Sequence, residues 1–188
     1  RQELGNLVLD GVPPHDPALA AQLDEWLAGR GASFRDFLPD GGVLPCAAHA
    51  TLLAESEVAL RLARDLAPGC TPREAAAAID ALAPAMEIVD MTQPQEDLQQ
   101  VLAGNLFHAA VVLGTPMTLP GLVSLPDITG GLWVNATQQG AVDAASLLQN
   151  PGALLAQVTG LLGQFGEGLR AGDWIITGSV VKPGPVQA

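Results

Sequence analysis

Two glutamates stand one residue apart in an otherwise apolar run, LLAESEVAL at positions 52–60. If this run is a β-strand, the side-chain period of two places Glu55 and Glu57 next to each other on one face of the sheet. Neighbouring carboxylates repel each other unless a cation or a shared proton lies between them. As a strand, the run therefore predicts a metal site.

A helix is the competing interpretation of the same residues. Leu, Ala, Glu and Arg are good helix formers, and Glu57 would pair with Arg61 one turn later, which is worth about 0.2–0.5 kcal/mol. The two carboxylates would then point in different directions and stay solvated. Local propensity alone favours this helix.

A metal ion such as Mg²⁺ needs further oxygen ligands, and two acidic residues follow in the strand-like run AMEIVDM at 85–91. Glu87 and Asp90 are three residues apart, so in a strand they point to opposite faces and only one can join the site. A carboxylate inside an apolar strand is rarely left unpaired. The alternative for either residue is a strand-end position near solvent.

The composition narrows the class of protein. The chain has 188 residues, 48% of them hydrophobic, and a net charge of −12. We expect no nucleic-acid or membrane partner, because a chain this acidic would not neutralise phosphates and its apolar runs are too short to span a bilayer. Cys46 and Cys70 form no metal spacing or disulfide framework, which is typical of buried thiols in a cytoplasmic protein.

Capping signals predict three helices. They begin after Asp16 with Pro17 at the first position, after Thr71 with Pro72 and Glu74, and after Asn150 with Pro151. The second helix is expected to end before Pro84. Strand-like runs lie at 85–91, 107–114, 131–137 and 173–179. This order favours an α+β fold over a regular alternating α/β sheet.

The order of these motifs resembles the 2-keto-4-pentenoate hydratase and 4-oxalocrotonate decarboxylase branch of the fumarylacetoacetate hydrolase superfamily. The resemblance is carried by VLPCAAHATLLAESEVAL (43–60), TPREAAAAIDALAPAMEIVD (71–90), EDLQQVLAGNLFHAAVVLG (96–114) and the C-terminal run that includes IITGS (150–188). No one of these motifs is specific by itself, but their collinear order is.

The resemblance implies a mixed β-sheet roll or barrel with flanking helices, and it places the Glu-x-Glu on a strand. By position, Glu55, Glu57 and Glu87 would then bind Mg²⁺ or Mn²⁺, with Asp90 replacing Glu87 if the register differs. The implied activity is that of a metal-dependent lyase on a short 2-oxo or 2-hydroxydienoic acid. Hydration of a 2-hydroxypenta-2,4-dienoate through a metal-stabilised enolate is expected before decarboxylation. The implied partners are further copies of the chain or a paralogous decarboxylase or hydratase.

Three further residues are candidates for catalysis. Ser179, at the end of IITGS, matches a family position that approaches the substrate, although a turn serine is an equal alternative. Lys182 could pair with a substrate carboxylate or be a solvated turn residue. His108 could carry protons near neutral pH, but a lone histidine beside an apolar strand is more often structural.

The chain also departs from the family pattern. Residues 1–42 contain no lysine where relatives carry one, Met91-Thr92 stands for Ser-Arg, and AGNLFHA (103–109) replaces a polar loop. The alternative function is therefore a catalytically altered member that binds or assembles without this chemistry. We expect an N-terminal helical segment at 1–42 and a hydratase-like catalytic domain at 43–188. Either could be incomplete, the second by one C-terminal strand.

Overall fold

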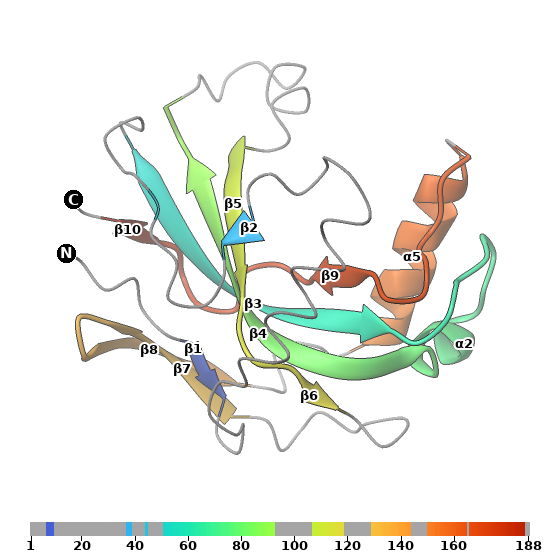
Figure 1. The fold of residues 1–188 in the computed structure, drawn as a ribbon, viewed down its shortest axis with the longest axis horizontal. Helices are drawn as coiled ribbons and strands as arrows, with labels where there is room; N and C mark the ends of the chain where they lie inside the picture. The colour runs from blue at the N-terminus through green and yellow to red at the C-terminus, as the bar shows by residue number, and fades with distance from the viewer. Residues whose placement is uncertain are drawn as a thin grey trace.

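The computed structural model describes residues 7–9, 37–38, 44, 51–92, 107–118, 129–143, 150–164 and 166–186. They form a mixed seven-stranded sheet, a three-stranded antiparallel sheet and two helices (Figure 1). The large sheet contains β2 (Phe37–Leu38), β3 (Leu52–Leu62), β4 (Ile79–Asp90), β5 (His108–Leu113), β6 (Met117–Thr118), β9 (Trp174–Ile176) and β10 (Gly184–Val186). The small sheet contains β1 (Leu7–Leu9), β7 (Thr129–Val134) and β8 (Thr137–Asp143), and the helices are α2 (Pro72–Ala76) and α5 (Pro151–Gly163). The α+β class and the mixed sheet are confirmed, since β2 pairs parallel to β5 while the other pairs are antiparallel.

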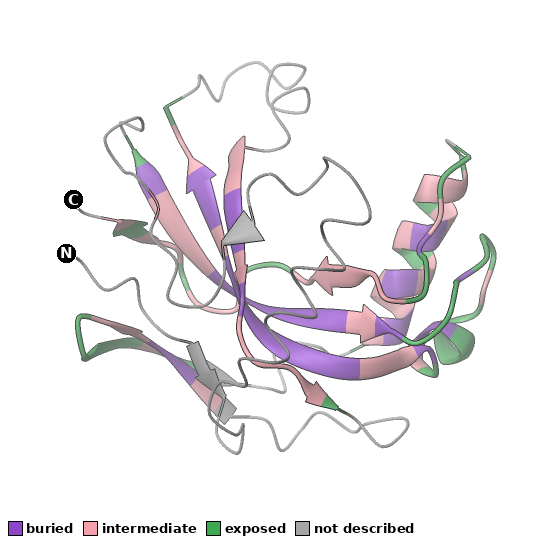
Figure 2. Cartoon of the chain, in the orientation of Figure 1, coloured by how far each residue is buried: buried purple, intermediate pink, exposed green. Residues whose placement is uncertain are grey.

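The antiparallel ladder of β3 and β4 is the centre of the molecule, and Figure 2 shows buried residues along both strands. On one face, Leu60 and Leu82 pack with Leu155 of α5. Farther along the same face, Ile88 packs with Leu132 of the small sheet. One face of the ladder is thus filled by apolar side chains, which provides most of the driving force for folding.

The strand interpretation of residues 52–60 is confirmed, and the helix that local propensity favours does not form. All of β3 pairs with β4, from Leu52 opposite Asp90 to Leu62 opposite Ile79. Val58, Ala59 and Leu60 are at most 1% exposed, so both faces of the strand are covered. Burial on two faces decides against a helix with a solvated side, because tertiary contacts outweigh propensities of a few tenths of a kcal/mol.

The helix predicted from Thr71 to Pro84 is only partly correct. The capping box of Thr71 and Glu74 is present, but α2 ends at Ala76 and β4 begins at Ile79. Pro84 lies inside β4, where its carbonyl accepts a bond from the Gly114 N–H just after β5 ends. The nitrogen and carbonyl of a strand residue point to the same side, so the Pro84 nitrogen faces away from β3. No bond between β3 and β4 is lost, and proline is tolerated at this position.

The strand predicted at 131–137 is a hairpin. β7 ends at Val134, β8 begins at Thr137, and these two residues pair directly. Asn135 and Ala136 form the two-residue turn with φ of 49° and 63°, as a type I′ turn requires. The turn was not predicted from the sequence, because the second turn position is usually glycine and Ala136 stands there instead.

The predicted start of α5 is confirmed, since the Asn150 side chain accepts a bond from the Ala153 N–H and Pro151 occupies the first turn. The helix predicted after Asp16 lies outside the described residues. Within 1–42, the described residues form β1 and β2. Over the described part of the chain, no helix is long and apolar enough to cross a membrane.

Candidate metal centre

Three carboxylates converge on the face of the β3–β4 ladder opposite the apolar core. Glu55 lies directly across from Glu87, and Glu57 follows two residues later on the same face. One ligand oxygen from each residue lies within 4.8 Å of the others. This geometry brings together the three ligands that the sequence predicts.

The residues that flank this cluster are small and buried. Ala59, Ala83 and Ala85 lie on the same face of the ladder, and each is at most 2% exposed. Glu57 is itself only 2% exposed. A buried carboxylate beside methyl groups has few polar neighbours to replace water, so its charge must be compensated locally.

The pKa values of Glu55 and Glu57 are both raised. Burial, together with the negative charges of Glu87 and Glu55, raises the pKa of Glu57 to about 7, although the Gly178 N–H opposes the shift. Burial and then repulsion by Glu87 also raise the pKa of Glu55. Both shifts have the sign expected for partly buried carboxylates that lie close to one another.

The segment after β9 runs beside β3 and supports Glu57. The Thr177 N–H donates to the Val58 carbonyl and the Val180 N–H to the Ser56 carbonyl. Between them, the Gly178 N–H donates to Glu57 Oε2 at 2.8 Å. Gly178 was not predicted as a site residue from the sequence. Its position in the Thr-Gly-Ser motif was the available signal, since its φ of 97° is one that glycine adopts easily.

Ser179 and Lys182 lie on the same segment. The Ser179 hydroxyl donates to the Val181 carbonyl at 2.7 Å, so it stabilises the local turn, and both Ser179 and Lys182 are exposed. The structure brings Ser179 beside the residue that holds Glu57. Their expected contacts with a substrate stay predictions.

Of the other two candidates, His108 reaches the carboxylates and Asp90 does not join them. His108 Nδ1 lies 2.7 Å from Glu87 Oε1. Asp90 is at the end of β4, on the opposite face from Glu87, and its Oδ1 accepts bonds from the Thr92 N–H and hydroxyl. The register therefore favours Glu87 over Asp90 as the third ligand.

This donor set fits a hard divalent cation. Mg²⁺ and Mn²⁺ prefer oxygen ligands, and Mg²⁺ is usually held by one or two carboxylates while it keeps several waters. Three carboxylates close together supply the negative charge that such an ion would neutralise, and the raised pKa values of Glu55 and Glu57 show that this charge is unfavourable without a nearby positive charge.

A family model described as Fumarylacetoacetate (FAA) hydrolase C-terminal matches residues 22–187. The chain belongs to this family. The resemblance in the sequence motifs is therefore confirmed, and so is the fold that it implies, since solved structures of family members superpose on the chain.

Similar curated proteins are hydratases and decarboxylases. The chain is 30% identical over 138 residues to 2-hydroxyhexa-2,4-dienoate hydratase of Comamonas testosteroni, covering 72% of this chain and 52% of that protein. It is 29% identical over 146 residues to 4-oxalocrotonate decarboxylase of Pseudomonas putida, covering 76% and 55%. The chain thus spans little more than half the length of these relatives.

Two solved structures share the fold and contain divalent metals. The 4-oxalocrotonate decarboxylase from Pseudomonas putida G7, complexed with magnesium and adipate, superposes with a TM-score of 0.71 at 24% identity, covering 99% of this chain and 71% of that one. The maleylpyruvate hydrolase from Sphingobium sp. SYK-6, in complex with manganese(II) and pyruvate, gives 0.55 at 19% identity, covering 81% and 51%.

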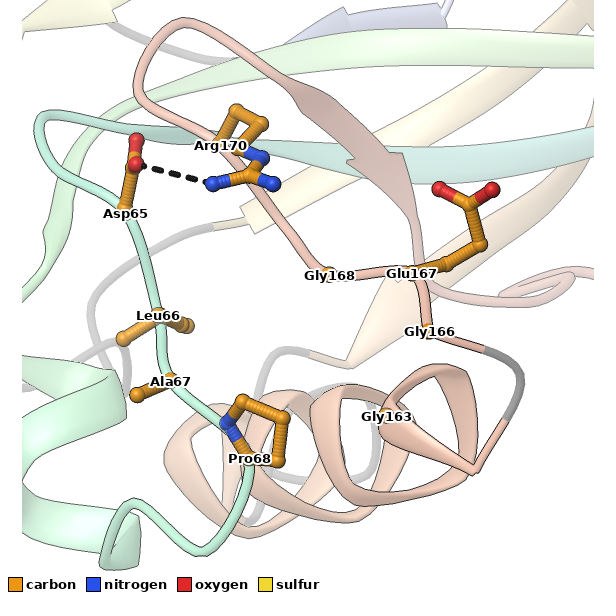
Figure 3. Close-up of a pocket in the computed structure, with 9 residues that line it drawn as sticks. All are labelled: Asp65, Leu66, Ala67, Pro68, Gly163, Gly166, Glu167, Gly168 and Arg170. Atoms are coloured by element: carbon orange, nitrogen blue, oxygen red, sulfur yellow. Dashed lines mark hydrogen bonds and ion pairs between the residues drawn. The ribbon is translucent and has the colours of Figure 1, made fainter.

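A second feature is an open cavity of about 450 Å³, shown in Figure 3, and none of the three glutamates lines it. It separates the loop after β3, with Asp65 and Pro68, from Gly163 at the end of α5 and from Arg170 in the segment that follows. Arg170 and Asp65 pair with each other at 3.2 Å, and Asp65 also accepts from the Ala171 N–H. These charges stabilise the junction between the two segments, so the cavity is not the candidate site.

Proposed function

We propose that this chain binds Mg²⁺ or Mn²⁺ through Glu55, Glu57 and Glu87 and acts as a lyase on a short 2-oxo or 2-hydroxydienoic acid, with hydration of a 2-hydroxypenta-2,4-dienoate-type substrate as its reaction. The observation that carries the proposal is the convergence of the three carboxylates within 4.8 Å. The names of the similar hydratases and decarboxylases support the substrate class.

Each part of the site has a role in this proposal. The bound cation supplies Lewis-acid stabilisation of negative charge that develops on a substrate oxygen. Glu57, held by the Gly178 N–H, stays oriented toward Glu55 and Glu87. The small side chains of Ala59, Ala83 and Ala85 keep water away from the ligands on the sheet side. Ser179 remains a proposed contact for the substrate, and Lys182 a proposed partner of the substrate carboxylate.

The metal site is tested by titrating the protein with Mn²⁺ in a calorimeter. Loss of an outer hydrogen-bond partner typically costs about 10–100-fold in metal affinity, so we expect loss of a direct ligand in Glu57→Gln to cost at least about 100-fold. Glu167→Gln is the matched control, because it removes the same charge from an exposed position that lines the separate cavity. Equal affinity of both variants for Mn²⁺ would contradict the proposed metal site.

The reaction is tested with 2-hydroxypenta-2,4-dienoate and Mg²⁺ by following the loss of the dienol absorbance. We expect turnover by the wild-type protein and its loss in Glu57→Gln, with Glu167→Gln active. Intact Mn²⁺ binding without turnover would instead support the altered family member, whose departures from the pattern include Met91-Thr92.

The proposed partners follow from the same family. We propose that the chain assembles with further copies of itself or with a paralogous decarboxylase or hydratase. Sedimentation or light scattering of the purified protein tests self-assembly, and a monomer at all concentrations would leave the paralogue as the remaining partner.

A further inference from the structure

A β-bulge on β5 determines where the His108 side chain points. Residues of β4 and β5 pair in regular order from Glu87 opposite Val111 to Ile88 opposite Ala110, but the next residue, Val89, lies opposite His108. Ala109 is thus an extra residue in β5. Such bulges redirect neighbouring side chains and are common next to active sites.

The consequence is a change of face. Glu87 and Val89 lie on the same face of β4, because side chains alternate, and directly paired residues of antiparallel strands share a face. Without the extra residue, Val89 would pair with Ala109, and His108 would lie on the apolar face. The bulge therefore moves His108 to the face that carries the three glutamates.

The backbone before the bulge is also unusual. Phe107 has a φ of 67°, a left-handed conformation that is uncommon and unfavourable for an aromatic residue. Such conformations persist where the surrounding structure fixes them. The bulge and this residue together lead the chain into β5 with the imidazole on the carboxylate side.

The result is a short, sheltered contact between His108 and Glu87. Nδ1 and Oε1 are 2.7 Å apart, and the side chains are only 20% and 18% exposed. As a ligand of the proposed cation, Glu87 would be ionised and could only accept a hydrogen bond, so Nδ1 would be the donor in this contact. His108 is not one of the three residues in the metal-binding cluster, so it acts on Glu87 from outside.

We propose that His108 is a positioning residue for the metal centre, whose Nδ1–H restricts rotation of the Glu87 carboxylate and holds it in the orientation that binds the divalent cation. This inference rests on the proposed metal site. It gives the histidine an electrostatic and geometric role that does not require it to exchange protons with the substrate.

Two variants test the proposal by Mn²⁺ titration of the whole chain. His108→Leu removes the donor, whereas His108→Asn keeps an N–H group close to the position of Nδ1. We expect His108→Leu to weaken Mn²⁺ binding about 10–100-fold and His108→Asn to bind within about threefold of the wild type. Urea unfolding of both variants without metal measures any purely structural effect.

Each outcome decides the question. Equal Mn²⁺ affinity of His108→Leu and the wild type would overturn the positioning role while leaving the metal site intact. Weakened binding in both variants would also overturn it, since the N–H donor would then not be the group that matters. A wild-type protein that binds no Mn²⁺ would overturn the metal site and, with it, this inference.

Discussion

The two ends of the β3–β4 ladder handle charge in opposite ways. At one end, Glu55, Glu57 and Glu87 bring like charges together, and burial raises the pKa of Glu57 to about 7. At the other end, Arg61 and Asp80 form a two-point ion pair at 2.9 and 3.0 Å, and the Arg61 guanidinium lies 5.7 Å from the centre of the Trp174 ring.

This difference separates a part of the ladder that is complete from one that needs a ligand. The Arg61–Asp80 end satisfies its own charges and lies near the apolar cluster around Leu60, Leu82 and Leu155. At the glutamate end, the three carboxylates repel one another, and a bound cation would offset this repulsion. We therefore expect substitutions near α2 and α5, at the Arg61–Asp80 end, to change stability without changing metal affinity. Substitutions of the carboxylates should change metal affinity.

The largest expected effect on stability comes from Gly152 in α5. A Cβ at this position would lie 2.0 Å from the Pro72 carbonyl oxygen and 2.9 Å from the Ala76 Cβ. Because the first contact is with backbone, we expect Gly152→Ala to lower the free energy of unfolding by about 3 kcal/mol. Urea denaturation measures this change, while the Mn²⁺ affinity of the folded protein should stay within about twofold.

Gly160 of the same helix provides the control. A Cβ there meets nothing within 4 Å, so Gly160→Ala should raise the free energy of unfolding by about 0.5–1 kcal/mol through helix propensity. Equal effects of the two substitutions would contradict the close packing of α5 on α2.

A more gradual effect, spread over several pH units, is expected from pH on the metal-free protein. The pKa of Glu57 is about 7 when folded and near its ordinary value of 4.5 when unfolded. The folded state therefore holds more protons between these values, and stability falls as pH rises from about 4.5 to 7, by at most about 1.4 kcal/mol per pH unit for one proton.

Two comparisons isolate this effect in urea denaturation at pH 5, 6, 7 and 8. Glu57→Gln should remove the Glu57 part of the slope. Mg²⁺ at about 100 times its dissociation constant should restore about 2.7 kcal/mol at pH 8. If stability depended on pH equally in the wild type and in Glu57→Gln, the pKa of Glu57 would not be raised in the metal-free protein.

The smallest effect is expected at the turn between β7 and β8, which belongs to neither end of the β3–β4 ladder. Ala136 is exposed with a φ of 63°, which glycine adopts without steric cost. Ala136→Gly should raise the free energy of unfolding by about 0.5–1 kcal/mol and leave Mn²⁺ binding unchanged. A loss of stability in thermal unfolding would argue against the type I′ turn.

The sequence by itself predicted the three acidic residues that the structure brings together and the starts of α2 and α5. Glu55, Glu57 and Glu87 could be predicted because the collinear motifs that contain them resemble those of the family. Thr71 and Asn150 could be predicted as caps because capping depends on neighbouring residues alone.

The tertiary structure decided what depends on pairing between distant segments. Helix α2 ends at Ala76, before the predicted end at Pro84, because the residues from Ile79 onward pair with β3. Burial in the sheet outweighs the local helix propensity of these residues. Gly178 reaches Glu57, and the bulge at Ala109 turns His108 toward Glu87, through registers set by neighbouring strands. A one-residue shift in register reverses the face of a side chain, which is why the partners of the carboxylates emerged only from the fold.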